Sequence, residues 1–465
     1  MNGSAEKLAQ ALAAIAGEAN TSGDPHEIGK YAIHGVTPKA LVRPANAEEI
    51  AEILRMCAAE KLGVVTRGAG TKIGMGGSPE RYDVALVTTR LEQVHGYDPG
   101  DLTLSVEAGA HMADVSKLLG EHGQFLPLSV PYQKRATIGG TVASGVDSPL
   151  RQGYGSARDF LLGAEFVTGD GTRAKSGGRV VKNVAGYDLH KLFIGSLGTL
   201  GVLTKINFKT FPVAEADGGF LASFREETGA IDFVRRIAQS AVAPATLEIL
   251  SPAMAALLGG QTDLGGMGMD SEGWRAASAG WAVIAGFGGS KKVLRRFETD
   301  LGGMASESGA AQAISLDGGT NRSVAERLRE AIPLLLDASP ATTVVRASVL
   351  PSRMGEIFAA SRRSGEKHGI RVAIVARGVG IVYTAFLPET SEEKIFERLA
   401  AAASEVVTAA EAAQGFGWIP WCPDELKRRA LIWGSGRPDA ALMRKLKLVF
   451  DPQAILSPGR FFGGI

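Results

Sequence analysis

The sequence predicts an α+β protein with two large domains: a glycine-rich, ligand-binding domain and an antiparallel sheet backed by helices. Three observations support this fold class. The chain has 465 residues, too many for one ordinary domain. Residues 136–211 join a glycine-rich stretch to well-patterned strands. After Pro212 the order strand, helix, strand, helix occurs twice, which is typical of a sheet backed by helices.

The composition excludes several classes of protein. With 50 basic and 49 acidic residues the formal net charge is +1, so there is no electrostatic case for nucleic-acid binding. No apolar run approaches the roughly 18 residues that a membrane span needs, and the N-terminus lacks the basic region of a signal peptide. Cys57 and Cys422 stand alone, without CxxC or metal-ligand spacing, which indicates reduced thiols in a cytoplasmic protein.

The N-terminal part leads to a glycine-rich loop. Residues 1–34 are expected to form a helix, over 5–19, and a lead-in. Asn46, with Glu49 three residues later, predicts a capping box at the start of the next helix. A short strand at Val64 then runs into the loop TRGAGTKIGMGG.

This loop does not fit the common phosphate motifs. Gly74 comes one residue too late for the Rossmann spacing GxGxxG, the residues after it cannot start a helix, and there is no GxxxxGK[ST] motif. A nest of backbone N–H groups suits an anionic diphosphate instead; an ordinary connection between strands is the alternative. The side chains expected to add donors to the nest are Arg67, Thr71 and Lys72.

Residues 136–211 contain a second glycine-rich stretch. Its small side chains would let a flat ligand lie directly on the backbone, and a glycine-rich turn without a ligand is the alternative. The Asp170-Gly171 pair between two apolar runs predicts a β-hairpin, which a mobile linker would not contain. The residues without bulk are Gly139, Gly140, Ala143, Ser144 and Gly145.

The C-terminal half is read as a second domain over residues 214–415, built from two similar halves. Residues 258–273, rich in glycine, are read as a flexible insertion within it. Residues 416–465 contain two more helices and a turn-rich end.

With these motifs laid out, the chain resembles the FAD-binding oxidoreductases of the vanillyl-alcohol oxidase, or PCMH, type. The resemblance covers residues 35–213 and the C-terminal DPQAILSPGRFF. It rests on RGAGT, on ATIGG with the YG, RD, LG and DG pairs that follow, and on GSLGTLGV, in the expected order. It implies a two-subdomain FAD-binding domain over 35–213, an α+β cap domain over 214–415, and C-terminal helices over 416–465 that return to the FAD domain.

The resemblance also implies which residues hold the cofactor. The RGAGT loop would cradle the FAD pyrophosphate, and the later motifs would contact the flavin and its ribityl chain. Some members attach FAD through a histidine in this loop; residues 66–77 contain none, so the FAD is expected to be non-covalent. The implied phosphate contacts are Arg67, Gly68, Ala69, Gly70, Thr71 and Lys72. The implied flavin contacts are Thr137, Gly139, Gly140, Ser144, Gly145, Tyr154, Arg158, Gly201 and Val202.

Within that family the chain is most similar to the FAD-binding subunit of bacterial glycolate oxidase, through VVKNVAGYDLHKLFIGSLGTLGV and SVLPSR. Relatives that oxidise D-lactate, D-2-hydroxyglutarate or glycolate carry a metal-binding GHxGDGNxH motif in the cap. The corresponding strand here, VARGVGIVYTAF, has no histidine. His368 is the only histidine after His190, and it is read as a solvated residue at a helix end. The sequence therefore predicts no metal site and offers no evident catalytic base.

Three residues remain as candidates for a substrate site. Arg346 and Arg377 lie in predicted cap strands, where an arginine could bind a substrate carboxylate; each could equally be an ion-paired strand residue. Lys182 is open between a flavin contact and a surface position.

The leading hypothesis is an FAD-binding subunit of a glycolate oxidase-like complex. Its expected partners are a histidine-bearing FAD paralogue and an iron–sulfur subunit, with a small 2-hydroxy acid as substrate. These partners could hold it on the inner face of the membrane. The alternatives are a self-sufficient FAD dehydrogenase of another 2-hydroxy acid, and a scaffold subunit that has lost the flavin.

Overall fold

The computed structural model describes residues 2–179, 186–259, 274 and 279–465. The chain forms two compact units. Unit 1 comprises Met1–Val146, Ser156–Pro212 and Gly436–Ile465. Unit 2 comprises Asp147–Gly155 and Val213–Ser435. The predicted insertion at 258–273 lies almost entirely outside the described residues.

The N-terminal part of unit 1 is a small sheet covered by helices. Strand order is β1-β2-β4-β3, with β2, β4 and β3 parallel and β1 antiparallel. The predicted capping box is confirmed at its N-cap, because Asn46 Oδ1 accepts a hydrogen bond from the Glu49 N–H at 2.8 Å. The elements are α1 (Asn2–Ala16), β1 (Thr21–Ser22), α2 (Pro25–Gly29), β2 (Ala40–Val42), α3 (Ala47–Glu60), β3 (Val64–Arg67) and β4 (Val84–Val87).

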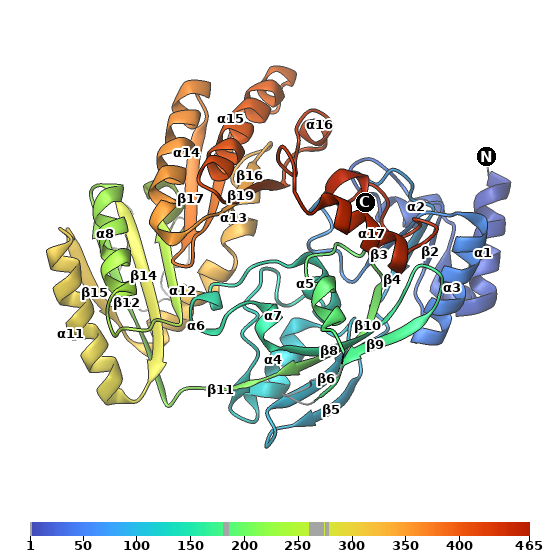
Figure 1. Ribbon diagram of the computed structural model, residues 1–465, viewed down its shortest axis with the longest axis horizontal. Helices are drawn as coiled ribbons and strands as arrows, with labels where there is room; N and C mark the ends of the chain where they lie inside the picture. The colour runs from blue at the N-terminus through green and yellow to red at the C-terminus, as the bar shows by residue number, and fades with distance from the viewer. Residues whose placement is uncertain (1, 180–185, 260–273, 275–278) are drawn as a thin grey trace. The chain divides into compact units, whose positions relative to one another are not determined.

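The second part of unit 1 is a five-stranded antiparallel sheet in the order β5-β6-β10-β8-β9 (Figure 1). The predicted hairpin is confirmed: β8 pairs with β9, and Gly171 in the turn has φ +78°. Its elements are β5 (Val94–Asp98), β6 (Thr103–Glu107), α4 (Met112–Gly120), β7 (Gln124–Phe125), α5 (Ile138–Ser144), α7 (Ala157–Phe160), β8 (Leu161–Val167), β9 (Arg173–Gly177), η2 (Leu189–Phe193), β10 (Val202–Lys209) and β11 (Phe211–Pro212).

The glycine-rich stretch after residue 136 is a helix rather than a turn. Thr137 caps α5, its Oγ1 accepting from the Gly140 N–H at 3.3 Å, and Gly145 ends the helix with φ +59°. Two glycines lower the intrinsic helix propensity of this segment, but the cap and the packing of the helix outweigh that cost.

The C-terminal segment packs within unit 1, as the sequence led us to expect for its last residues. After α17 (Ala440–Phe450) the chain lies along β3, where the Val64 N–H donates to the Ile455 carbonyl and the Ser457 N–H to the Val64 carbonyl, both at 2.8 Å. A short turn, η5 (Phe462–Gly464), ends it.

Unit 2 is built on one eight-stranded sheet in the order β15-β12-β14-β13-β17-β18-β16-β19, with every pair antiparallel. Its strands are β12 (Ala216–Phe224), β13 (Thr246–Leu250), β14 (Trp281–Gly289), β15 (Gln312–Leu316), β16 (Thr343–Ser348), β17 (Arg371–Arg377), β18 (Ile381–Leu387) and β19 (Phe416–Trp421). Its helices are α6 (Arg151–Tyr154), α8 (Glu227–Ala238), α9 (Pro252–Gly259), α11 (Lys291–Glu307), α12 (Gly318–Arg329), α13 (Ala331–Asp337), η4 (Pro351–Arg353), α14 (Met354–His368), α15 (Glu393–Ala412) and α16 (Asp424–Lys427).

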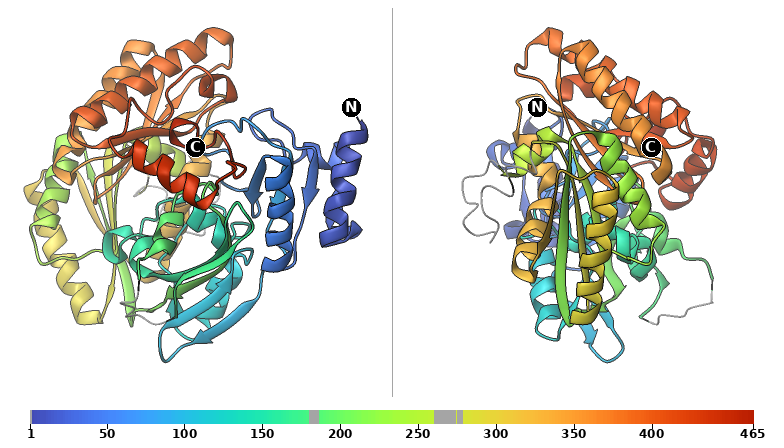
Figure 2. Two further views of the ribbon diagram at one scale, coloured as in Figure 1. Left: turned by 45° about the vertical axis from the view of Figure 1, so that its right-hand side comes forward. Right: turned by 90° about the vertical axis from the view of Figure 1, so that its left-hand side faces the viewer.

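The main core of unit 2 lies between one face of this sheet and the helices α8, α11, α14 and α15 (Figure 2). Alternate strand residues such as Val345, Ile374 and Val382 are buried there beside Phe233 and Leu399. The residues between them point to the opposite face of the sheet. An antiparallel sheet backed by helices is therefore the observed fold of this unit.

The boundaries of unit 2 differ from the predicted 214–415. Strand β19 lies beyond residue 415, yet it pairs with β16 as an edge of the sheet, and the unit continues to Ser435. The short segment Asp147–Gly155 also belongs to it, with the Gly153 N–H donating to the Ala245 carbonyl at 3.1 Å. Both departures arise from pairings between residues far apart in the sequence, which no local pattern reports.

Candidate functional site

A pocket in unit 1 is formed where three segments meet: the loop after β3, the first turns of α5, and the loop before β10. Most of the expected cofactor contacts lie on it. The lining residues are Thr66, Arg67, Gly68, Ala69, Gly70, Thr71, Lys72, Ile73, Thr88, Ala108, Thr137, Gly139, Gly140, Ala143, Ser144, Ser196, Leu197, Gly198, Gly201, Leu203 and Arg460.

The glycines of this pocket are required by neighbouring protein atoms as well as by any ligand. A Cβ on Gly68 would lie 2.0 Å from Thr137 Oγ1. A Cβ on Gly70, where φ is +75°, would lie 1.9 Å from Arg67 Nη2. A Cβ on Gly139 would lie 2.9 Å from the Ala108 carbonyl oxygen. The glycines therefore bring the loop, α5 and β6 close together, and they would be needed even without a cofactor.

Arg67 supplies the independent sign of a ligand. Its Nε and Nη1 are buried and have no hydrogen-bond partner among the residues that the structure describes, and its guanidinium carbon lies 4.7 Å from the centre of the Tyr31 ring. Lys72 is also buried, with Nζ 3.2 Å from Thr71 Oγ1. A buried cation with unmet donors is costly unless an anion satisfies it. The donor set fits the diphosphate of FAD, and these two residues with the backbone N–H groups could hold it.

A second cavity continues from Arg67 and extends the cationic surface. It is lined by Arg43 and Lys30 together with Tyr31 and Glu27. Arg43 is held by Glu27, with Nη2 2.7 Å from Oε1.

Arg460 clamps the loop that forms the pocket. It is 2% exposed, and its Nη2 donates to the carbonyls of Ile73 at 2.7 Å and Met75 at 2.6 Å. Its Nη1 donates to the Gly77 carbonyl at 3.2 Å. Burial lowers the pKa of the Arg460 guanidinium to about 10. We did not predict this role from the sequence; the only signal was the position of Arg460 in the C-terminal motif.

Four of the expected contacts lie elsewhere. Val202 is fully buried in the core of unit 1, and the next residue, Leu203, faces the pocket instead. Gly145 is the C-cap of α5, where an added Cβ would lie 2.8 Å from the Gly195 Cα. Arg158 is exposed on α7, and Tyr154 belongs to unit 2.

In unit 2 a row of side chains crosses five adjacent strands on the face away from the main helices. Register places Glu248 opposite Arg377, and Arg346 opposite both Tyr383 and Trp418. The two arginines lie over the Tyr383 ring, at 5.6 Å for Arg377 and 5.9 Å for Arg346. We call these five residues the cross-sheet row.

Arg377 is balanced by two carboxylates, so it matches the ion-paired alternative rather than a substrate ligand. Its Nη1 lies 3.0 Å from Glu248 Oε1, and its Nε lies 2.8 Å from Asp147 Oδ2. Asp147 also pairs with Arg151 at 3.2 Å. Burial raises the pKa of Glu248 to about 7, against the attraction of Arg377. Burial disfavours the charge of Arg377, but the carboxylates of Glu248 and Asp147 outweigh it and raise its pKa.

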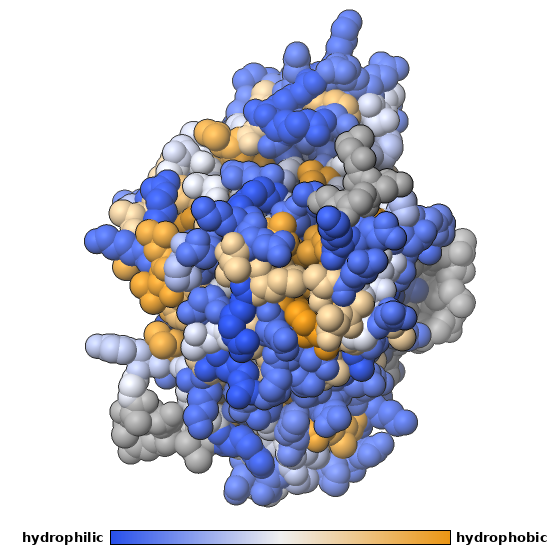
Figure 3. All heavy atoms as spheres, turned by 90° about the vertical axis from the view of Figure 1, so that its right-hand side faces the viewer, coloured by the Kyte–Doolittle hydropathy of each residue, from blue (hydrophilic) through white to orange (hydrophobic). Residues whose placement is uncertain are grey.

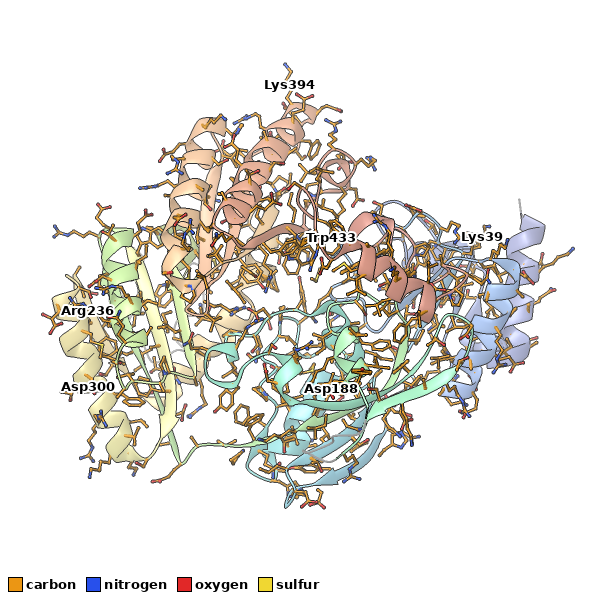
Figure 4. The ribbon with its side chains drawn as sticks, in the orientation of Figure 1. Lys39, Asp188, Arg236, Asp300, Lys394 and Trp433 are labelled. Atoms are coloured by element: carbon orange, nitrogen blue, oxygen red, sulfur yellow. The ribbon has the colours of Figure 1, made fainter. Side chains whose placement is uncertain are left out.

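Arg346 has no such partner. It donates from Nη1 to Ser348 Oγ at 2.9 Å and from Nε to the Tyr383 hydroxyl at 3.3 Å, and it pairs with no carboxylate in the part of the chain that the structure describes. Trp433, labelled in Figure 4, lies at the edge of the row. Its ring stacks on that of Trp418, with ring centres 4.6 Å apart. Lys182, the third candidate, lies outside the described residues.

The histidines and cysteines form no metal centre. All seven histidines and both cysteines lie in described positions, and no group of three His, Cys, Asp or Glu suited to a metal occurs among those positions. His368, expected to be solvated, is mostly buried at the end of α14 and lies 3.1 Å from Glu405 Oε1. Burial raises the pKa of each cysteine thiol, Cys57 and Cys422, to about 12. Across residues 2–179, 186–259, 274 and 279–465, no helix is long and apolar enough to span a bilayer.

Two family matches agree with the division of the chain into unit 1 and unit 2. Residues 38–177 match the family described as "FAD binding domain", and residues 219–461, more than half of the chain, match "FAD linked oxidases, C-terminal domain". The chain is 27% identical over 430 residues to glycolate oxidase subunit GlcD of Bacillus subtilis, covering 91% of this chain and 89% of that protein. It is 34% identical over 199 residues to glycolate oxidase subunit GlcE of Escherichia coli, covering 43% and 55%. A D-lactate dehydrogenase of Archaeoglobus fulgidus is 25% identical, covering 91% and 93%.

Solved structures share the fold at low identity. A p-cresol methylhydroxylase with substrate bound has a TM-score of 0.78 at 18% identity, covering 98% of this chain and 96% of that one. An alkyldihydroxyacetonephosphate synthase has a TM-score of 0.72 at 18% identity, covering 97% and 84%. These two proteins inform the fold alone. Together, the family matches and these folds confirm the predicted PCMH-type architecture.

Proposed function

Because the chain belongs to the FAD-linked oxidases, we propose that it is the FAD-binding subunit of a glycolate oxidase-like complex that oxidises a 2-hydroxy acid. The observation that carries this proposal is a contrast within the chain. In unit 1 two buried nitrogen atoms of Arg67 have no partner among the described residues, which suits an FAD diphosphate, while unit 2 contains a single histidine. Unit 1 therefore has donors for a diphosphate, whereas unit 2 lacks the histidine-rich motif that would supply the catalytic base.

In this proposal the loop after β3 holds the diphosphate through Arg67, Lys72 and the backbone N–H groups of Gly68 to Thr71. The flavin end lies along Thr137, Gly139, Gly140, Ser144 and Gly201. The FAD has no covalent link to the protein in this proposal, because no histidine occurs in residues 66–77.

Oxidising a 2-hydroxy acid to a 2-oxo acid removes a hydride and a proton. FAD, when bound, accepts the hydride. The proton needs a positioned base, typically worth about 10²–10⁴ in rate. Unit 2 offers one imidazole, that of His368, which lies 3.1 Å from Glu405 Oε1, so we propose that a partner subunit supplies the base. The relatives named as glycolate oxidase subunits and D-lactate dehydrogenase support this substrate class, and the GlcE likeness supports a multi-subunit assembly.

Reduction of the isolated chain tests the proposal. Purified alone and loaded with FAD, it is expected to bleach with dithionite but not with glycolate or D-lactate. Co-expression with a histidine-bearing FAD paralogue and an iron–sulfur protein, the partners that the proposal requires, is expected to restore bleaching by the substrate. Rapid, chelator-insensitive reduction of the isolated chain by a 2-hydroxy acid would contradict the subunit role.

A self-sufficient dehydrogenase is the second candidate, and the cross-sheet row is the observation that favours it. Arg346 has no carboxylate partner among the described residues and could bind that of a substrate in a bidentate manner. Tyr383, which accepts a hydrogen bond from Arg346, could take the substrate proton in place of histidine if it is ionised to the phenolate beside the two arginines. Under this candidate, Tyr383→Phe would abolish substrate bleaching of the isolated chain and leave dithionite bleaching intact.

A further inference from the structure

Helix α17 has an outer face that is apolar and uncovered. Leu442, Leu448 and Val449 are 58%, 59% and 74% exposed, and their spacing places them along one side of the helix. Large side chains this exposed occur singly on many surfaces, but three on eleven residues form a patch. Figure 3 shows one face of the molecule, on which some hydrophobic side chains lie among hydrophilic ones.

The inner face of the same helix is fastened to the wall of the cofactor pocket. Lys447, 5% exposed, donates from Nζ to the Thr199 carbonyl at 2.9 Å and to the Leu456 carbonyl at 2.7 Å, and pairs with Asp451 at 2.6 Å. Thr199 belongs to the segment 196–201, which lines the pocket. Phe450 packs on Phe166 and Phe193. The helix is therefore a rigid layer whose inner side holds the pocket wall and whose outer side faces solvent.

The charge of the outer face has one sign. The helix sequence AALMRKLKLVF contains no acidic residue. Arg444 and Lys445 are exposed, and neither forms an ion pair with a carboxylate of the described residues. A complementary partner would therefore present apolar groups with carboxylates around them.

We propose that the outer face of α17 docks the electron-carrying partner subunit through an acidic, apolar surface. The inference rests on the proposed function, in which electrons pass between this chain and a partner. An electron carrier must approach the cofactor, and α17 is the layer fastened directly to the wall of the cofactor pocket. Small interfaces with an apolar centre and a charged rim suit redox partners. The two cations and three apolar side chains are few for stable binding to a lipid surface, which usually needs a longer amphipathic helix.

The test uses the full chain with a Leu448→Asp/Val449→Asp double substitution, co-expressed with a histidine-bearing FAD paralogue and an iron–sulfur protein, the partners that the proposed function requires. The iron–sulfur subunit recovered per chain is expected to fall by about tenfold or more, since two central apolar contacts are lost. FAD content and bleaching by dithionite are expected to stay at the wild-type level. Val94→Asp is the matched control: Val94 is 45% exposed on strand β5, and its replacement is expected to leave recovery unchanged.

Three results would overturn the assignment of this surface. Wild-type recovery of the iron–sulfur subunit by the double variant would exclude α17 as its dock. A wild-type dimer that becomes a monomer on substitution would identify a second copy as the occupant. Loss of binding to anionic phosphatidylserine vesicles, with the subunit retained, would identify a lipid surface. If the wild-type chain recovers no redox subunit at all, the proposed function itself fails and this inference fails with it.

Discussion

The two units use arginines with buried nitrogen atoms in opposite ways. The Nε and Nη1 atoms of Arg67 in unit 1 have no hydrogen-bond partner among the described residues, whereas Arg377 in unit 2 lies between the carboxylates of Glu248 and Asp147. Burying an unpaired charge is costly, so an arginine with unmet donors indicates a missing anion. An arginine balanced by two carboxylates instead fixes the structure around it. The comparison therefore favours Arg67 as the residue that binds an anion and Arg377 as a structural residue, although the sequence offers both as candidates.

The structure also changes what the glycines of the pocket indicate about a bound ligand. Many glycines would be costly in a protein that binds nothing, which counts against a flavin-free scaffold. In the structure, Gly68 and Gly139 are needed by the packing of Thr137 and Ala108, so their presence does not by itself show a ligand. The unmet donors of Arg67 carry that argument instead.

The largest expected effect is on unit 1, from Gly70→Val. The new Cβ would collide with the Arg67 guanidinium, and a valine cannot adopt φ +75° without strain, so FAD binding is expected to be lost. FAD per chain, measured by absorbance after gel filtration, checks this. Gly74→Val is the control in the same loop, because a Cβ there meets no atom within 4 Å, and it is expected to keep its FAD. Equal FAD content in both variants would show that the loop is placed wrongly.

The next effect separates the two arginines of the cross-sheet row. Arg377→Met leaves two buried carboxylates without their cation and is expected to destabilise unit 2 by about 3–5 kcal/mol. Arg346→Met loses two hydrogen bonds to neutral groups and the contact with the Tyr383 ring, about 2 kcal/mol in all.

Tryptophan fluorescence in urea measures both, because all five tryptophans lie in unit 2 and report its unfolding alone. Equal losses of stability would contradict the distinction between a structural and an available arginine.

The third effect is a pH dependence set by Glu248. Its pKa is raised to about 7 in the folded chain, above its ordinary value of 4.5, so its contribution to stability is present below pH 4.5 and is lost as the pH rises to about 7. Glu248→Gln removes this loss. The stability of the variant relative to the wild type is therefore expected to rise by on the order of 3 kcal/mol across that window.

Urea midpoints followed by tryptophan fluorescence at pH 4.5 and pH 7.5 give the difference. A difference that stays constant with pH would show that Glu248 is charged throughout, and that Arg377 fully compensates for its burial.

Features set by neighbouring residues could be predicted from the sequence. The Asn46 cap and the Asp170-Gly171 hairpin each depend on a few adjacent side chains, and both are present. The loop after β3 lines the pocket of unit 1, as expected from its contiguous glycines and cations, and its contact with FAD stays a prediction. The antiparallel sheet of unit 2 was predicted from the repeated order of its elements.

Features set by distant contacts could not be predicted. Arg377 forms an ion pair with Asp147, 230 positions away, so no local pattern could show whether it is a substrate ligand or an ion-paired strand residue. Arg460 reaches Ile73 across 387 positions. Strand β19 was assigned to the C-terminal segment because its pairing with β16 is invisible locally. The helical form of α5 was missed for a related reason, since its packing outweighs the poor helix propensity of two glycines.

The measurement that tests the central claim most directly is acid precipitation of the purified chain after loading with FAD. One non-covalent FAD held by unit 1 predicts about one FAD in the supernatant for each precipitated chain, and almost none when Arg67 is replaced by methionine. Flavin that stays with the precipitated wild-type chain would contradict a non-covalent site. Full FAD retention by the Arg67→Met variant before precipitation would contradict the placement of the diphosphate.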